Sequence, residues 1–103
     1  SKQQLAGIGI SLSPLDGGNL LIANLVPGGP AALSREISRG QELVAVDGRL
    51  VKGSTVPQVI RLVLGPPGSQ VLLKIRDEEG REREVAITRK AAPSPSKAPA
   101  AGG

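Results

Sequence analysis

Residues 8–13 alternate apolar and small or polar residues in the way that a half-buried β-strand does. In the stretch IGISLS, the apolar residues Ile8, Ile10 and Leu12 occupy every second position. This period of two places the three side chains on one face of a strand. After the turn-forming residues PLDGG at 14–18, the more continuously apolar stretch NLLIANLV at 19–26 predicts a second, more buried strand.

Glycine and proline divide the middle of the chain. PGGP at 27–30 ends the second strand, and the apolar residues that follow predict one short helical turn, because proline suits the first position of a helix. ELVAV at 42–46 predicts another strand. The dipeptide Asp47-Gly48, which is typical of tight turns, ends that strand.

The clearest helix signal is TVPQVIRLVL at 55–64. Thr55 and Gln58, three residues apart, fit a capping box, and Pro57 falls in the first turn, where a missing N–H donor costs little. GPPG at 65–68 predicts the end of the helix.

Two more apolar stretches complete the fold. VLLKIR at 71–76 and EVAIT at 84–88 predict the strands of a hairpin that turns at 77–80. These elements predict an α+β domain over residues 1–90, built as a small, partly open antiparallel β-barrel or sandwich of five to six strands capped by two helices. Residues 91–103, AAPSPSKAPAAGG, have too little apolar surface to offset the entropy of ordering and are expected to be a disordered linker or tail.

The longer helix has more apolar surface than one packed face requires. At 100° per residue its aliphatic side chains cover an arc of about 200°, whereas packing on one sheet needs roughly 100°. We therefore expect the helix to bury two faces, with Val59 and Leu62 in the core. Val56, Ile60 and Val63 lie on the second face and could line a groove. The alternative is that a domain without aromatic residues uses all of them as core.

The composition excludes several classes of function. The 103 residues include no histidine, cysteine or aromatic residue. The usual zinc ligands and the His-assisted nucleophiles of hydrolases are therefore absent, and we expect no metal, cofactor or catalytic residue. Without aromatic side chains, bases of single-stranded nucleic acid have no stacking platform. The net charge of +4 is interleaved with acidic residues, as in RDEEGRERE at 76–84, which favours a solvated hairpin over a nucleic-acid patch. No apolar stretch is long enough to span a membrane.

Four segments, in this order, resemble the sequence signature of PDZ domains. GIGI at 7–10 is similar to the family's G-Φ-G-Φ loop, in which Φ is an apolar residue, and VPGGPAA at 26–32 is similar to the segment that leads into its short first helix. GQELVAVDG at 40–48 resembles the motif G-D-x-Φ-x-x-Φ-[ND]-G. Residues 54–76 resemble the second helix and the strand after it. The resemblance covers most of residues 5–90.

The chain departs from the family pattern in two places. Only SKQQLA precedes the loop, so the first strand is short. In this segment Lys2 is a candidate for the basic residue that often accompanies the loop. The second departure is Gln41, which stands where the family usually has aspartate.

The resemblance implies a module that binds the free C-terminal tails of other proteins, which add as an antiparallel strand while the loop amides bind the terminal carboxylate. The carboxylate-binding loop would comprise Gly7, Ile8, Gly9 and Ile10. The strand that pairs with the ligand would comprise Ile10, Ser11, Leu12 and Ser13. The pocket for the last ligand side chain would be lined by Ile8, Ile10, Leu12, Ile60 and Val63.

The resemblance also assigns roles to single residues. Gly7 would let the chain bend into the loop, and Gly9 would let the amides approach the carboxylate. Val56 stands at the helix start, where many members of the family carry a histidine that bonds a Ser or Thr hydroxyl of the ligand. Valine leaves such a hydroxyl unpaired, so we expect an apolar ligand residue two positions before the last.

Two functional contexts fit these features. The first is a scaffold or adaptor module, monomeric as a fragment, that recruits partner proteins by their C-termini. The second is the substrate-recognition domain of a C-terminal-processing protease, because GPPGSQVLLKIR at 65–76 also resembles the PDZ domains of such proteases. Their Ser–Lys catalytic domain would lie outside this chain. A third interpretation is a domain that dimerises or pairs internally and leaves its groove empty. In every case no catalytic activity, nucleic-acid partner or membrane partner is expected of these residues.

Overall fold

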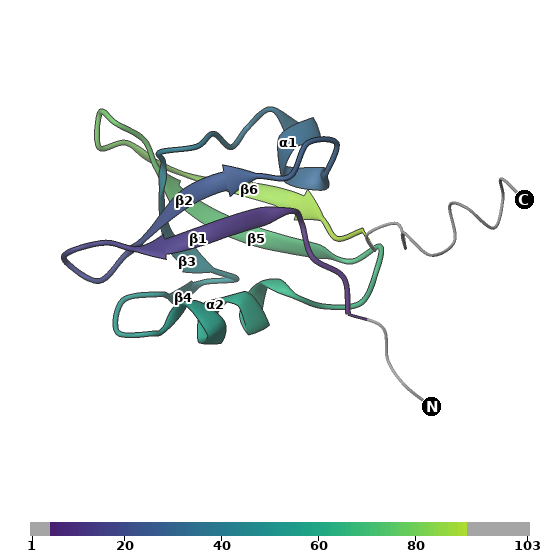
Figure 1. Cartoon of the computed structure of the whole chain (residues 1–103), viewed down its shortest axis with the longest axis horizontal. Coiled ribbons are helices and arrows are strands. Elements are labelled where there is room, and N and C mark those ends of the chain that lie inside the picture. The colour runs from purple at the N-terminus through teal and green to yellow at the C-terminus, as the bar shows by residue number, and fades with distance from the viewer. Residues whose placement is uncertain (1–4, 91–103) are drawn as a thin grey trace, which may run out of the picture.

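The computed structural model describes residues 5–90. Lys2 and the expected tail at 91–103 lie outside the described residues. The elements follow one another along the chain as β1 (Ile10–Pro14), β2 (Leu20–Leu25), α1 (Pro30–Ser34), β3 (Glu42–Val46), β4 (Arg49–Leu50), α2 (Val56–Val63), β5 (Gln70–Arg76) and β6 (Glu82–Thr88) (Figure 1).

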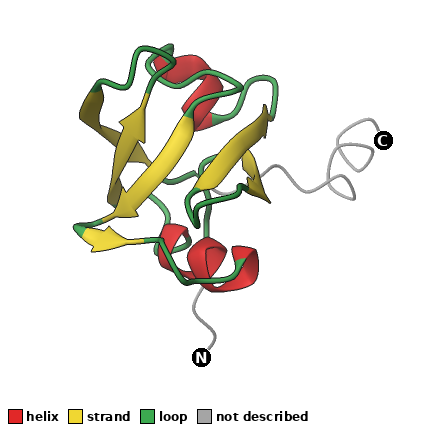
Figure 2. Ribbon diagram, turned by 90° about the vertical axis from the view of Figure 1, so that its left-hand side faces the viewer, coloured by secondary structure: helices red, strands yellow, loops and turns green. Residues whose placement is uncertain are grey.

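The strands form one antiparallel sheet that does not close. Its order is β1-β2-β3-β5-β6, and the short β4 pairs with β3. β1 and β6 are therefore the edge strands at the two ends of this order. α2 contacts β1 and α1 contacts β6, and Figure 2 shows one helix at either end of the curved sheet. The expected partly open barrel with two helices is confirmed.

The core is built from aliphatic side chains on the inner face of the sheet. The period of two in β5 buries Val71, Leu73 and Ile75, each at most 1 % exposed, and leaves the residues between them partly exposed. In β6 the same alternation buries Val85 and Ile87.

The tight turn expected at Asp47-Gly48 is confirmed. Both residues adopt the left-handed conformation, with φ of 49° and 81°, which two-residue hairpin turns require. The Asp47 backbone N–H donates to the Leu72 carbonyl at 2.7 Å, and its Oδ1 accepts from the Leu72 N–H at 2.8 Å. These two bonds tie the β3–β4 turn to β5.

The capping box of the longer helix is also confirmed. The Thr55 side chain accepts from the Gln58 N–H at 3.2 Å, and the Gln58 side chain accepts from the Thr55 N–H at 2.8 Å. These bonds satisfy two of the donors that a helix start leaves free. The helix thus begins at Val56.

Within residues 5–90, no helix is long and apolar enough to cross a membrane.

Candidate functional site

β1 offers free backbone groups along one side, beginning at Ile10. The strand pairs only with β2, and Ile10 lies opposite Leu25. The bond from the Val26 N–H to the Gly9 carbonyl, 2.9 Å long, flanks this pair. In an antiparallel ladder such a bond marks a non-hydrogen-bonded pair. The N–H and C=O of Ile10 therefore point away from β2, toward the free edge.

Leu12 presents its backbone in the same direction. It lies opposite Ile22, after a β-bulge that shifts the register between β1 and β2. The Ile22 N–H donates to the Gln41 carbonyl at 2.8 Å, and the Ile22 carbonyl accepts from the Gly40 N–H at 2.9 Å. Both backbone groups of Ile22 thus form hydrogen bonds on the side of β3. Leu12 therefore has no backbone hydrogen bond to Ile22, and its N–H and C=O point to the free edge.

The backbone groups of the four residues expected to pair with a ligand strand therefore point alternately to the free edge and to β2. Ile10 and Leu12 turn their backbone groups to the free edge, whereas those of Ser11 and Ser13 face β2. Of these four residues, Ile10 and Leu12 would therefore bond to a strand added at this edge.

Three successive amides meet at the start of β1. Within residues 5–90, the N–H groups of Ile8 and Gly9 donate to no backbone or side-chain acceptor. Their carbonyls are held, since that of Ile8 accepts from the Ala31 N–H and that of Gly9 from the Val26 N–H, both at 2.9 Å. Together with the edge-facing N–H of Ile10, they form a run of donors suited to one anionic group.

The bend that exposes these amides lies at Gly9, which has φ of 79°. The expected bend at Gly7 is wrong. Gly7 has no left-handed φ and forms an antiparallel bridge with Lys90. Because the chain bends at Gly9, the strand begins at Ile10 and not at Ile8 as expected. A Cβ on Gly7 would come within 3.3 Å of Leu64 Cδ2, and one on Gly9 within 3.3 Å of Val26 Cβ.

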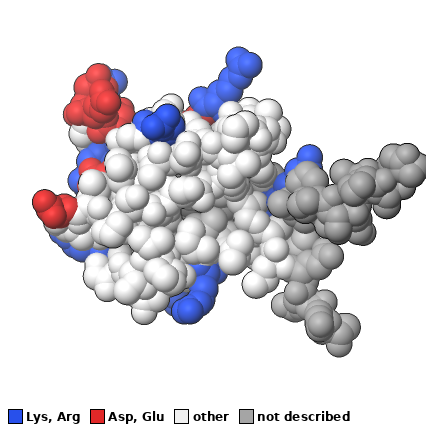
Figure 3. Space-filling model, in the orientation of Figure 1, with Lys and Arg blue, Asp and Glu red and all other residues white. Residues whose placement is uncertain are grey.

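Four partly exposed aliphatic side chains lie along β1 and α2. Ile10 and Leu12 come from β1, and Val56 and Ile60 come from α2, which contacts β1. Val56, Ile10 and Leu12 also pack against the core. These four residues are called the β1–α2 surface below. Figure 3 shows the face that carries β1 and α2 as mostly uncharged, with Lys, Arg, Asp and Glu at its margins.

Two of the five expected pocket residues belong to the core instead. Ile8 is 1 % exposed and Val63 is 2 % exposed. They lie beneath the β1–α2 surface and support it, while Ile10, Leu12 and Ile60 provide its accessible part. The faces of α2 divide accordingly: Val59 and Val63 are fully buried. The expectation that Val63 faces outward beside Ile60 is wrong.

The ion pairs of Arg76 share no residue with the loop or with the β1–α2 surface. Arg76 pairs with Glu82 at 2.6 Å and with Glu42 at 3.5 Å, and the hydrogen bond that its guanidinium donates to the Glu82 carboxylate raises the pKa of Arg76. None of the loop amides or the side chains of the β1–α2 surface titrates. Within residues 5–90, no three His, Cys, Asp or Glu residues gather to hold a metal ion.

A separate hollow of about 570 Å³ lies between α1 and β6. It shares no residue with the loop or with the β1–α2 surface. Its lining consists of Pro30, Leu33, Ser34, Pro67, Gly68, Ala86, Ile87, Thr88, Arg89 and Lys90.

Comparison with known proteins gives consistent matches. A family model described as PDZ domain matches residues 21–77. The crystal structure of the PDZ domain of a carboxy-terminal protease from Vibrio cholerae, in complex with peptide, is 34 % identical with a TM-score of 0.76, and the match covers 84 % of this chain and 94 % of that one.

Two larger proteins match over part of their length. The photosystem II D1 C-terminal processing protease is 26 % identical with a TM-score of 0.79, and the match covers 90 % of this chain and 25 % of that one. Mature CPAF, at 22 % identity and a TM-score of 0.62, shows likeness of fold; the match covers 93 % of this chain and 22 % of CPAF. This chain thus spans about a quarter of the D1 protease.

Proposed function

This chain belongs to the PDZ domain family, and from that premise we propose that its β1–α2 surface binds the C-terminal residues of polypeptides by β-strand addition. The observation that carries the proposal is the run of free amide donors at Ile8, Gly9 and Ile10, placed at the start of an edge strand. An anion bound there lies in line with a peptide strand along β1, which is the arrangement of a terminal carboxylate.

The energetics of such binding divide into two parts. Charge-assisted hydrogen bonds from the amides to the carboxylate contribute about 1.5–3 kcal/mol each. The last ligand side chain would pack on Ile10, Leu12 and Ile60, and full burial of a Val, Leu or Ile contributes about 1.5–3 kcal/mol. The ligand class is therefore a free C-terminus with an aliphatic last residue.

We also propose substrate recognition in a C-terminal-processing protease as the context, in preference to a scaffold. The supporting observation is that the similar solved structures include the PDZ domain of a carboxy-terminal protease and a D1 C-terminal processing protease. In this role the domain holds the C-terminus of the substrate, and peptide hydrolysis is carried out by residues outside these 103. The Vibrio cholerae domain, which was solved in complex with peptide, is consistent with that division of labour.

Titration with a peptide in acid and amide forms tests the carboxylate capture. We expect the acid to shift the NMR amide signals of residues 8–12, and the matched C-terminal amide to bind about 10- to 100-fold more weakly, because one charge-assisted bond is worth about 1.5–3 kcal/mol. The acid affinity should hold from pH 5 to pH 9, because only the ligand carboxyl, with a pKa of about 3.5, titrates at the site. Equal binding of the acid and the amide would refute carboxylate capture.

The preference two positions before the last ligand residue rests on Val56. A ligand hydroxyl buried against this side chain has no partner, at a cost of about 1–3 kcal/mol. We expect peptides with an apolar residue at that position to outcompete the matched Ser or Thr peptides about tenfold. The Val56→His variant should reduce or reverse this preference. Stronger binding of the Ser and Thr peptides by the unmodified domain would contradict the assignment.

A further inference from the structure

A buried cation lies directly behind the loop. Arg89 is 8 % exposed and is the only buried polar or charged residue in the part of the chain that the structure describes. It continues the inward alternation of Val85 and Ile87 at the end of β6. The sequence contains this signal, because Arg89 stands two residues after Ile87 and four after Val85. None of the motifs in the sequence analysis includes Arg89.

The guanidinium of Arg89 joins three elements. Its Nε donates to the Val63 carbonyl at 2.8 Å, and its Nη1 donates to Ser69 Oγ at 2.8 Å and to the Gln70 carbonyl at 3.2 Å. Its Nη2 lies 4.0 Å from Oδ2 of Asp47, whose side chain is about half exposed. Val63 is the last residue of α2, so Arg89 satisfies a carbonyl that a helix end leaves free.

The contacts continue from Arg89 to the loop through its neighbours. Gly65 lies against the guanidinium so closely that a Cβ on Gly65 would come within 2.6 to 2.8 Å of three guanidinium atoms. Gly65 also bonds to Ala6 in both directions, at 2.7 and 3.0 Å. On the other side, the Lys90 N–H donates to the Gly7 carbonyl at 3.0 Å. Ala6, which precedes the loop, and Gly7, its first residue, are thus held by neighbours of Arg89.

The C-terminal end of α2 carries a partial negative charge, which is unfavourable for binding a carboxylate nearby. The C-terminus of a helix carries about half a negative charge, which repels anions nearby. The bridge between Gly65 and Ala6 brings this end of α2 to the loop. Arg89 donates to the carbonyl of the last helical residue, and because the cation is buried it is screened little by salt.

We propose, given that the proposed function holds, that Arg89 is a positioning residue for the ligand carboxylate. It offsets the negative end of α2 and holds the chain before the loop, so that the amides of Ile8, Gly9 and Ile10 face an anion. It acts through Val63, Gly65 and Lys90 and does not contact the ligand.

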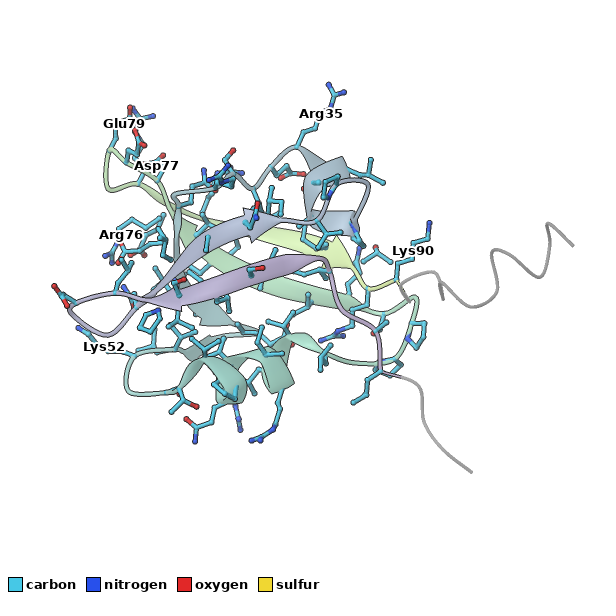
Figure 4. All side chains as sticks on the ribbon, in the orientation of Figure 1. Arg35, Lys52, Arg76, Asp77, Glu79 and Lys90 are labelled. Carbon is cyan, nitrogen blue, oxygen red and sulfur yellow. The ribbon has the colours of Figure 1, made fainter. Side chains whose placement is uncertain are left out.

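The test is the ratio of acid to amide peptide affinity in Arg89→Lys and Arg89→Gln. We expect R89Q to lower this ratio roughly tenfold with a smaller change in amide affinity, and R89K, which keeps the charge, to retain most of it. Arg76→Gln is the control for net charge, because Figure 4 shows Arg76 at the opposite end of the molecule from Lys90. R76Q should leave the ratio unchanged.

The outcomes separate the two proposals. If R89Q weakens acid and amide binding equally, Arg89 is structural only and the inference is overturned, while the proposed function stands. If the unmodified domain itself binds both forms equally, the proposed function fails first. If R89Q does not fold, the ratio of acid to amide peptide affinity is measured in Asp47→Asn instead. It removes the carboxylate 4.0 Å from Arg89 and keeps an acceptor for the Leu72 N–H. A ratio raised a few-fold by D47N supports the inference, and an unchanged or lowered ratio contradicts it.

Discussion

Replacing Ile60 with aspartate is expected to lower the affinity for a C-terminal peptide by about a hundredfold or more while the domain remains folded. The side chain is partly exposed and, unlike Val56, is not among the residues that pack against the core. The substitution removes an apolar partner worth about 1.5–3 kcal/mol to the last ligand side chain. It also places a negative charge next to the ligand carboxylate, which adds repulsion. Isothermal titration calorimetry with an acid peptide measures the loss.

Leu33→Asp is the matched control for Ile60→Asp. Leu33 lies on α1 and is 66 % exposed, so the same change in charge and polarity occurs on a helix away from β1. We expect L33D to bind the peptide like the unmodified domain. If I60D unfolds the domain, as thermal unfolding would show, Ile60 is a core residue and its assignment to the β1–α2 surface is wrong.

Replacing Gly65 with alanine is expected to destabilise the domain by about 3 kcal/mol, because the new Cβ displaces a guanidinium whose bonds are worth about 1.5–3 kcal/mol each. Gly65 does not need glycine for its backbone, since its φ is not left-handed. The requirement comes from Arg89, which supplies the three atoms nearest to the added Cβ, the closest of them at 2.6 Å. In a domain of this size the melting temperature should fall by roughly 10–25 °C.

A double-mutant cycle isolates the cause of the Gly65 effect. In an Arg89→Ala background the blocking side chain is absent, so Gly65→Ala should then cost less than about 0.5 kcal/mol. It could even stabilise slightly, because alanine reduces the entropy of the unfolded chain. A cost that is the same in both backgrounds would show that Gly65 is required for another reason.

The elements could be predicted because their signals are local. Thr55 and Gln58 cap a helix three residues apart, and Asp47-Gly48 forms a turn from two adjacent residues. Likewise the alternation in residues 71–76 sets which side chains share a face before any partner is chosen. The loop at 7–10 could be located from its glycines and from three other segments in the same order. Local conformational preferences and motif order therefore sufficed for the fold and for the place of the candidate site.

The details of the site could not be predicted in the same way. Ile60 and Val63 stand three residues apart in one apolar arc, and the periodicity does not tell which of them another element covers. The structure buries Val63 and leaves Ile60 partly exposed. Ile8 and Ile10 differ likewise, since Ile8 enters the core and Ile10 borders the free edge. Burial depends on which surfaces meet in three dimensions, and apolar character alone does not encode it.

The sequence by itself determined both helices, the glycine loop, the turns and every strand except the two-residue β4, because these follow from interactions among residues near one another in the chain. Only the tertiary structure decided that β1 is an edge strand, that the chain bends at Gly9 and that Arg89 is buried behind the loop. Each of these depends on contacts between distant segments. The physical reason is that free backbone donors and a buried charge are defined by what surrounds them, and those surroundings exist only in the folded chain.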